Sequence, residues 1–199
     1  MNRCAAFIII LLAGMSPGLA QDLWYSKGET AFDAGNYQGA VDAFSRGIGQ
    51  CPGNAALYII RGIAYNRLGS YDQALKDYDK AIELKPVSIF YSGPEMLYTD
   101  PGNRKRYLSA YDRAIRVYPV SLAYWCRGNI HTGRGELNKA LRDYNNAIRA
   151  YSKNGAAYFG RGNAYQRLGK KIHAREDWRR AADLGHQGAR RLIKQRGIR

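Results

Sequence analysis

The sequence predicts an all-α fold, in which about five helix-turn-helix units stack into a right-handed superhelical solenoid and end in a capping helix. The first observation is a repeated phrase: YIIRGIAYNRLG at 58–69 and YFGRGNAYQRLG at 158–169 share eight of twelve positions, one hundred residues apart. The second is a row of prolines spaced 34 and 33 residues apart, Pro52, Pro86 and Pro119. The third is a row of glycines spaced 34, 66 and 34 apart, Gly28, Gly62, Gly128 and Gly162. A period near 34 residues is typical of stacked helix pairs.

Residues 1–20 are predicted to be a secretory signal peptide. A positively charged start at Met1–Arg3 precedes the apolar run CAAFIIILLAG, and Gly18-Leu19-Ala20 has the small-residue spacing of a cleavage site. The run is shorter than the about 20 apolar residues that span a bilayer, which disfavours the alternative of an uncleaved anchor. We therefore expect a mature chain from Gln21, with no integral membrane segment after cleavage and a periplasmic or secreted location.

Five units are expected to follow, with boundaries at 21–54, 55–87, 88–120, 121–154 and 155–188. The fourth and twenty-fourth residues of every unit are aromatic, and the twenty-seventh is glycine or alanine. The eighth is glycine and the twentieth alanine in every unit except the third. In period and in these positions the chain resembles the tetratricopeptide repeat (TPR) family over nearly the whole expected mature length.

The small residues predict where the helices touch, because two antiparallel helices approach closely only over small side chains. Positions 8 and 20 are expected to serve contacts inside a unit, and position 27 contacts between units. Ser70 and Gln73 are predicted to form a capping box at the start of a helix. Four glycines suit the left-handed residue that ends a helix, namely Gly35, Gly69, Gly135 and Gly169.

The third unit departs from the pattern. Pro94 falls at its seventh position, where a proline inside a helix costs about 3 kcal/mol. We expect a short helix at 94–99 and a second helix that opens at Asp100-Pro101. The unit is therefore predicted to be degenerate, either by harmless drift or as a widened groove or hinge.

Positive charge gathers in the second half of the chain. Residues 88–199 hold 23 Lys and Arg against 8 Asp and Glu, whereas 21–87 hold 7 against 8. Residues 189–199 are expected to form a capping helix with a basic tail, since Ala189, Leu192 and Ile193 share one helical face. This charge favours an acidic partner. For an exported chain an acidic envelope component is a better candidate than nucleic acid, and ordinary solvation is the alternative.

An arginine occupies position 7 in three units, and an aspartate follows sixteen residues later in each. The two positions lie roughly opposite in an antiparallel hairpin, so we predict structural ion pairs within the units. The alternative is an arginine row that captures ligand carboxylates. The predicted pairs are Arg61 with Asp77, Arg127 with Asp143, and Arg161 with Asp177.

The resemblance to TPR proteins implies a concave face, lined by the first helix of each unit, that holds an extended peptide or a partner helix. Aromatic and amide side chains at the positions expected to face this groove suit a peptide's side chains and backbone. The candidate ligand-binding residues are Tyr25, Glu29, Asn66, Trp125, Asn129, Thr132, Phe159, Asn163 and Gln166. Packing between units is the alternative, above all for Ile59 and Phe159.

One variant of the family clamps a C-terminal carboxylate with lysines and asparagines. Only Asn129 and Asn163 match that pattern here, and the lysines are absent. The resemblance therefore does not imply co-chaperone activity of the carboxylate-clamp kind.

The sequence contains no arrangement typical of catalysis. It has no Cys/His cluster, no nucleophile-base arrangement and no phosphate-binding loop, so no metal, no cofactor and no enzyme activity are predicted. The expected function is a non-catalytic scaffold that binds a protein or peptide partner in the groove. The alternative is an envelope-binding module that attaches to an anionic polymer or lipid surface through its basic C-terminal half.

Overall fold

The computed structural model describes residues 17–84 and 119–198, which consist of helices and short turns. The helices are α2 (Pro17–Asp33), α3 (Tyr37–Gln50), α4 (Ala55–Arg67), α5 (Tyr71–Glu83), α7 (Pro119–Gly133), α8 (Leu137–Ala150), α9 (Gly155–Arg167), α10 (Lys171–Asp183) and α11 (Gln187–Arg196). The described part of the chain thus holds four helix hairpins and one final helix. The prediction of an all-α stack of helix pairs is confirmed.

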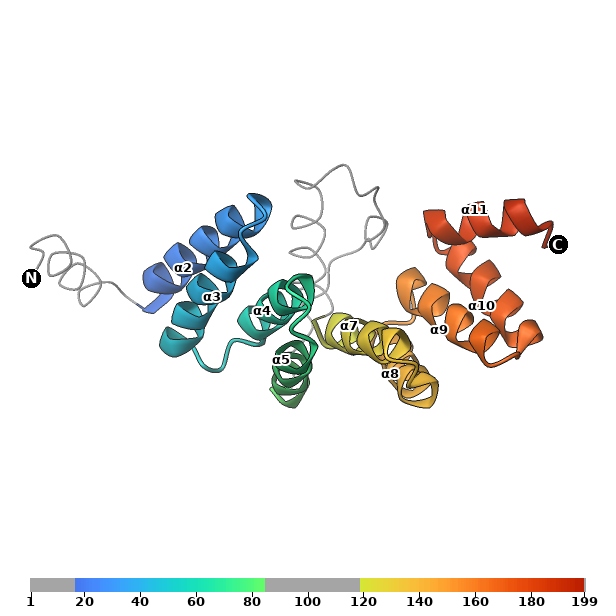
Figure 1. The fold of residues 1–199 in the computed structure, drawn as a ribbon, viewed down its shortest axis with the longest axis horizontal. Coiled ribbons are helices and arrows are strands. Elements are labelled where there is room, and N and C mark those ends of the chain that lie inside the picture. The colour runs from blue at the N-terminus through green and yellow to red at the C-terminus, as the bar shows by residue number, and fades with distance from the viewer. Residues whose placement is uncertain (1–16, 85–118, 199) are drawn as a thin grey trace, which may run out of the picture.

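The hairpins follow one another along the molecule, with α2 and α11 at opposite ends of the described solenoid (Figure 1). The second helix of each hairpin also packs against the first helix of the next. This holds for α3 with α4 and for α8 with α9, and α10 packs in the same way against α11. The result is one continuous core that passes from hairpin to hairpin.

Helix α7 packs directly against α5 and also contacts α4. The sequence placed a degenerate third unit, 88–120, between these helices. Apart from Pro119 and Val120 that unit lies outside the described residues, as do the helix starts expected at Pro94 and Asp100. In the described part of the chain, the unit that begins at residue 121 therefore lies beside the second unit.

In the hairpins α4–α5 and α7–α8, an aromatic ring of the second helix lies over a glycine of the first helix. A Cβ atom added to Gly62 would lie 2.7 Å from the ring of Tyr78, and one added to Gly128 would lie 2.9 Å from the ring of Tyr144. The alanines at position 20, such as Ala74, are fully buried beside these contacts. The close approach of two helices is therefore the physical reason for the small residues at positions 8 and 20.

The predicted helix-ending glycines agree with the structure, and the predicted capping box does not. Glycines with a left-handed backbone end the first helix of each hairpin, at Gly35, Gly69, Gly135 and Gly169, with φ values of 77, 76, 78 and 75°. Ser70 occupies the N-cap of α5, but its side chain makes no capping hydrogen bond, so the capping box with Gln73 is wrong.

The two ends of the chain are described in part. Residues 1–16 of the predicted signal peptide lie outside the described residues, and α2 begins at Pro17. At the other end, α11 matches the expected capping helix, with Ala189 fully buried. No helix within 17–84 or 119–198 has the length and apolar character to span a membrane.

Candidate functional site

The structure contains all three ion pairs expected from the sixteen-residue offset. In each pair the arginine Nε and Nη2 atoms donate to the two carboxylate oxygens of the aspartate, a two-pronged geometry that favours charge recognition. The distances are 2.9 and 2.7 Å for Arg61–Asp77, 2.9 and 2.6 Å for Arg127–Asp143, and 2.8 and 2.6 Å for Arg161–Asp177. The hydrogen bond to the aspartate is the main cause of a raised pKa at each of the three arginines.

The third guanidinium nitrogen of each arginine reaches the preceding hairpin. Its acceptor is always the residue at position 25 of that hairpin's unit. Nη1 donates from Arg61 to Ser45 at 3.0 Å, from Arg127 to Asp79 at 2.6 Å, and from Arg161 to Asn145 at 2.6 Å. These arginines therefore bond to other residues of the solenoid and do not form a ligand-binding row. The matching bonds of Arg127 and Arg161 also show that α7 packs on α5 in the same register in which α9 packs on α8.

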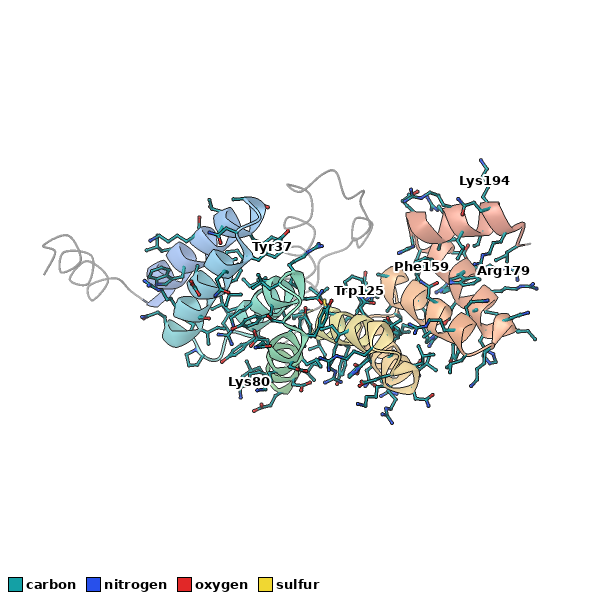
Figure 2. All side chains as sticks on the ribbon, viewed as in Figure 1. Tyr37, Lys80, Trp125, Phe159, Arg179 and Lys194 are labelled. Carbon is teal, nitrogen blue, oxygen red and sulfur yellow. The ribbon has the colours of Figure 1, made fainter. Side chains whose placement is uncertain are left out.

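Two aromatic candidates for ligand binding are packing residues. Trp125 on α7, labelled in Figure 2, is only 6% exposed and belongs to the core. Phe159 on α9 stacks on His186 with ring centroids 4.4 Å apart. Ile59, at the same fifth position of its unit, is fully buried. The first helices α4, α7 and α9 contact one another in succession, which favours packing of side chains at this position between hairpins. The burial of Trp125 contradicts its interpretation as a groove residue, whereas Phe159 is half-buried and its stacking on His186 favours the alternative of packing.

Two asparagines at position 9 are oriented by aromatic residues of their own hairpins. Tyr144 donates its hydroxyl to Oδ1 of Asn129 at 2.8 Å, and Trp178 donates its indole N–H to Oδ1 of Asn163 at 3.0 Å. Since an indole N–H can only donate, the amide of Asn163 turns its NH₂ group away from Trp178. Thr132 takes part in the same network, because its hydroxyl lies 2.9 Å from that of Tyr144.

A pocket of about 300 Å³ lies where α4, the start of α5 and α7 meet. It is lined by Asn66, Tyr71, Asn129, Ile130, Gly133 and Arg134. The pocket brings together two of the predicted ligand-binding residues, Asn66 and Asn129, from different units. The other four lining residues were not predicted, because the pocket exists only where α7 stacks directly on the second hairpin.

The lining combines hydrogen-bond donors with apolar surface. Nη2 of Arg134 lies 2.7 Å from Oδ1 of Asp72, which holds the guanidinium at the edge of the pocket, and this bond is the main cause of the raised pKa of Arg134. Tyr71 is 46% exposed, whereas Ile130 is buried. Amide and guanidinium donors suit the carbonyl groups and acidic side chains of a peptide, and the ring of Tyr71 suits its apolar side chains.

The remaining candidates lie elsewhere on the molecule. Tyr25 and Glu29 are half-buried on α2, where the ring of Tyr25 lies 6.3 Å from that of Phe44. Asn163 and Gln166 are half-buried on α9. None of these four residues lines the pocket between α4 and α7.

The titratable groups do not assemble into a metal or nucleophilic centre in the described ranges. No cluster of three or more His, Cys, Asp or Glu side chains there could hold a metal ion. Nδ1 of His131 lies 2.6 Å from a carboxylate oxygen of Glu136. Burial raises the pKa of the Cys126 thiol to about 12, so that group stays protonated and unreactive near neutral pH.

Comparison with known proteins identifies the repeat. Sequence profiles of the tetratricopeptide repeat match residues 5–55 and 55–86, and a TPR repeat profile matches 128–169. The Hsp70-Hsp90 organizing protein 2 of Arabidopsis thaliana is 41% identical over 61 residues, which are 31% of this chain and 11% of that protein. The chain thus covers about a tenth of the length of this relative.

Two solved structures share the fold. A tetratricopeptide repeat protein of Parabacteroides merdae aligns with a TM-score of 0.62 at 20% identity, over 90% of this chain and 61% of that one. The second TPR domain of human RPAP3, solved in complex with the HSP70 peptide SGPTIEEVD, aligns with a TM-score of 0.54 at 23% identity, over 75% of this chain and 98% of that one. At these identities the likeness concerns the fold.

Proposed function

Because the chain is a tetratricopeptide repeat protein, and hence a non-catalytic protein–protein interaction module, we propose that it holds an extended segment of a partner protein in the pocket between α4 and α7. The observation that carries this proposal is the convergence of Asn66, Asn129 and Arg134 around a space of about 300 Å³. Their donors would bind backbone carbonyls and an acidic side chain of the segment, while Tyr71 packs on its apolar part.

The structural neighbours support a peptide as the ligand. The RPAP3 domain was solved with the HSP70 peptide SGPTIEEVD, which contains two glutamates and an aspartate. In this chain the fifth position of the first helices carries Tyr25, Ile59, Trp125 and Phe159, so no lysine stands there to neutralise a terminal carboxylate. We therefore propose that recognition depends on acidic side chains near Arg134 and much less on a free C-terminus.

The test selects binders from a random peptide library and measures each by fluorescence anisotropy. We expect the double substitution Asn66→Ala/Tyr71→Ala to weaken binding by about tenfold or more, since it removes a donor and a large apolar contact. The matched control is Asn138→Ala on the exposed face of α8, which should bind as the unchanged chain does. Peptides that bind the double variant and the unchanged chain equally well would contradict the proposal.

We also propose that the module works outside the cytoplasm, after removal of residues 1–20. The support is the residue pattern of that segment, together with the position of the packing side chains of α2. Trp24, Gly28 and Phe32 are buried and all follow Gln21, so a chain cleaved there would retain these three packing residues of the first hairpin. N-terminal sequencing of the protein from its native source tests this, and a chain that retains residues 1–20 would contradict it.

A further inference from the structure

An aliphatic side chain stands out at the turn between α9 and α10. Ile172 is 71% exposed, which makes it the most exposed large hydrophobic side chain in the described ranges. Leu168, at the end of α9, is 36% exposed on the same turn. Water contact with these two side chains is unfavourable, so a partner that covers them would gain free energy.

Basic side chains stand beside this apolar pair in the sequence and follow it along α10. Lys170, Lys171, Arg175, Arg179 and Arg180 are all exposed, and none of them forms an ion pair with a carboxylate among the described residues. Figure 2 shows Arg179 pointing away from the ribbon. The exposed carboxylates of α10 are Glu176 and Asp183, since Asp177 is buried against Arg161. The surface formed by α10 and the turn before it therefore carries more positive than negative charge.

The positive charge at the start of α10 is unfavourable for the stability of that helix. Lys170 is the N-cap residue and makes no side-chain capping bond, Lys171 is the first helical residue, and the first turn holds no acidic residue. Positive charge at a helix N-terminus opposes the helix dipole, and lysine is a poor cap. The corresponding start of α5 has Ser70 and Asp72 instead. The two lysines therefore do not stabilise the start of this helix.

We propose that the basic–aliphatic turn, defined as Leu168–Arg175 with Arg179 and Arg180, docks on an anionic lipid surface. The basic side chains would attract anionic headgroups, and Ile172 and Leu168 would enter the boundary with the acyl chains. A soluble acidic polymer would use the charges but gain nothing from the aliphatic pair. Single-stranded nucleic acid would require exposed aromatic rings for base stacking, and the exposed large apolar side chains of this turn are aliphatic. None of the residues of this turn lines the α4–α7 pocket, so this inference stands independently of peptide binding.

The test is cosedimentation of the full chain with vesicles of phosphatidylcholine, with and without phosphatidylglycerol. We expect sedimentation only with the phosphatidylglycerol vesicles, and less of it as salt rises. The double substitution Lys170→Gln/Lys171→Gln should weaken binding about thirtyfold, and Ile172→Ser about tenfold. The lysine double variant should unfold at the same or a higher temperature, because it removes positive charge from a helix start.

Matched controls separate this surface from general charge. Lys76→Gln/Arg142→Gln removes two exposed basic groups from α5 and α8, and Leu68→Ser changes the equivalent of Leu168 in the second hairpin. Both should keep vesicle binding within about twofold. Equal binding to neutral vesicles, or equal losses in the control and lysine double variants, would overturn the proposal. So would an unaffected Ile172→Ser variant whose binding is abolished by soluble polyglutamate, which would identify an acidic polymer as the partner.

Discussion

Arginine at position 7 joins three parts of the solenoid through one side chain. In Arg127, two nitrogens bind Asp143 of the same hairpin and the third binds Asp79 of the preceding one, while the guanidinium carbon lies 5.3 Å from the ring of Tyr124. Asp143 is 3% exposed. A buried carboxylate is tolerated only while its cation is present, so the pair makes the residues at positions 7 and 23 mutually dependent.

Replacement of Arg127 by methionine should therefore destabilise the fold by about 3–5 kcal/mol, because it leaves Asp143 buried without its guanidinium partner and with only the imidazole of His131, 3.7 Å away, beside its carboxylate. Arg127→Lys should cost less, since it keeps the charge and loses the two-pronged geometry. Urea unfolding followed by circular dichroism measures both. Arg142→Met, at an exposed site on α8, is the control, and an equal cost there would contradict the argument.

Gly62 is a second residue whose chemistry can be tested singly. Gly62→Ala places a Cβ atom 2.7 Å from the buried ring of Tyr78, so we expect a loss of about 1–3 kcal/mol in the free energy of unfolding. Gly49→Ala on α3 meets no atom within 4 Å and should stabilise its helix by about 0.5–1 kcal/mol. Opposite signs in thermal denaturation are expected, and a neutral Gly62→Ala would refute close packing at this site.

At the scale of a single element, α11 depends on the protonation state of its cap. Nδ1 of His186 accepts the backbone N–H of Ala189 at 3.0 Å, which requires an unprotonated nitrogen at that position. His186 is 6% exposed, and burial lowers its pKa from 6.5 to about 4, with a smaller contribution from Arg191. The final helix is therefore capped by a neutral imidazole.

This cap predicts an acid-sensitive contribution to stability. Because the folded pKa lies below the unfolded value, the contribution is complete above pH 6.5 and is lost as pH falls to about 4. The loss amounts to about 3 kcal/mol at most. His186→Asn keeps a capping oxygen and does not titrate. We expect the urea midpoint of the unchanged chain to fall more steeply with acidification than that of this variant, and parallel pH curves would contradict the assignment.

On the scale of the whole molecule, the solenoid is continuous from α5 to α7, although residues 84–118 separate these two helices in the sequence. Helix α7 stacks on α5, and Arg127 meets Asp79 as Arg161 meets Asn145. A second bond, from Arg134 to Asp72, ties the same two elements. The order of hairpins in space therefore follows the complementarity of their faces, and the length of the chain between them does not decide it.

Deletion of residues 86–118 tests this continuity. The deletion joins Lys85 to Pro119, leaves four residues between Glu83 and Ser121, as between Gln50 and Ala55, and preserves the sequence KPVS. We expect cooperative unfolding, with a free energy equal to that of the full chain or up to about 2 kcal/mol higher, because a shorter loop costs less entropy to close. An insoluble or non-cooperative product would show that the removed residues support the stack.

Local patterns in the sequence predicted most of the hairpin architecture. Gly62 and Ala74, the helix-ending glycines and the Arg61–Asp77 offset all follow from contacts within one unit, which a 34-residue period records. The pocket did not follow, because Tyr71 and Arg134 become neighbours only through the stacking of α7 on the second hairpin. Trp125 was misread for a related reason: position 5 shows an aromatic side chain in the sequence, but the packing of the next hairpin decides whether ligand or protein covers it.

The bond between Arg127 and Asp79 also has a consequence for changing the order of hairpins in the solenoid. Adjacent hairpins recognise each other through positions 7 and 25, and the partners of Arg61, Arg127 and Arg161 at position 25 are a serine, an aspartate and an asparagine. The same contact can therefore form between different pairs of units. A shuffled chain in which α9 and α10 follow α5 would place Arg161 beside Asp79, and Arg161 would donate to Asp79 as Arg127 does.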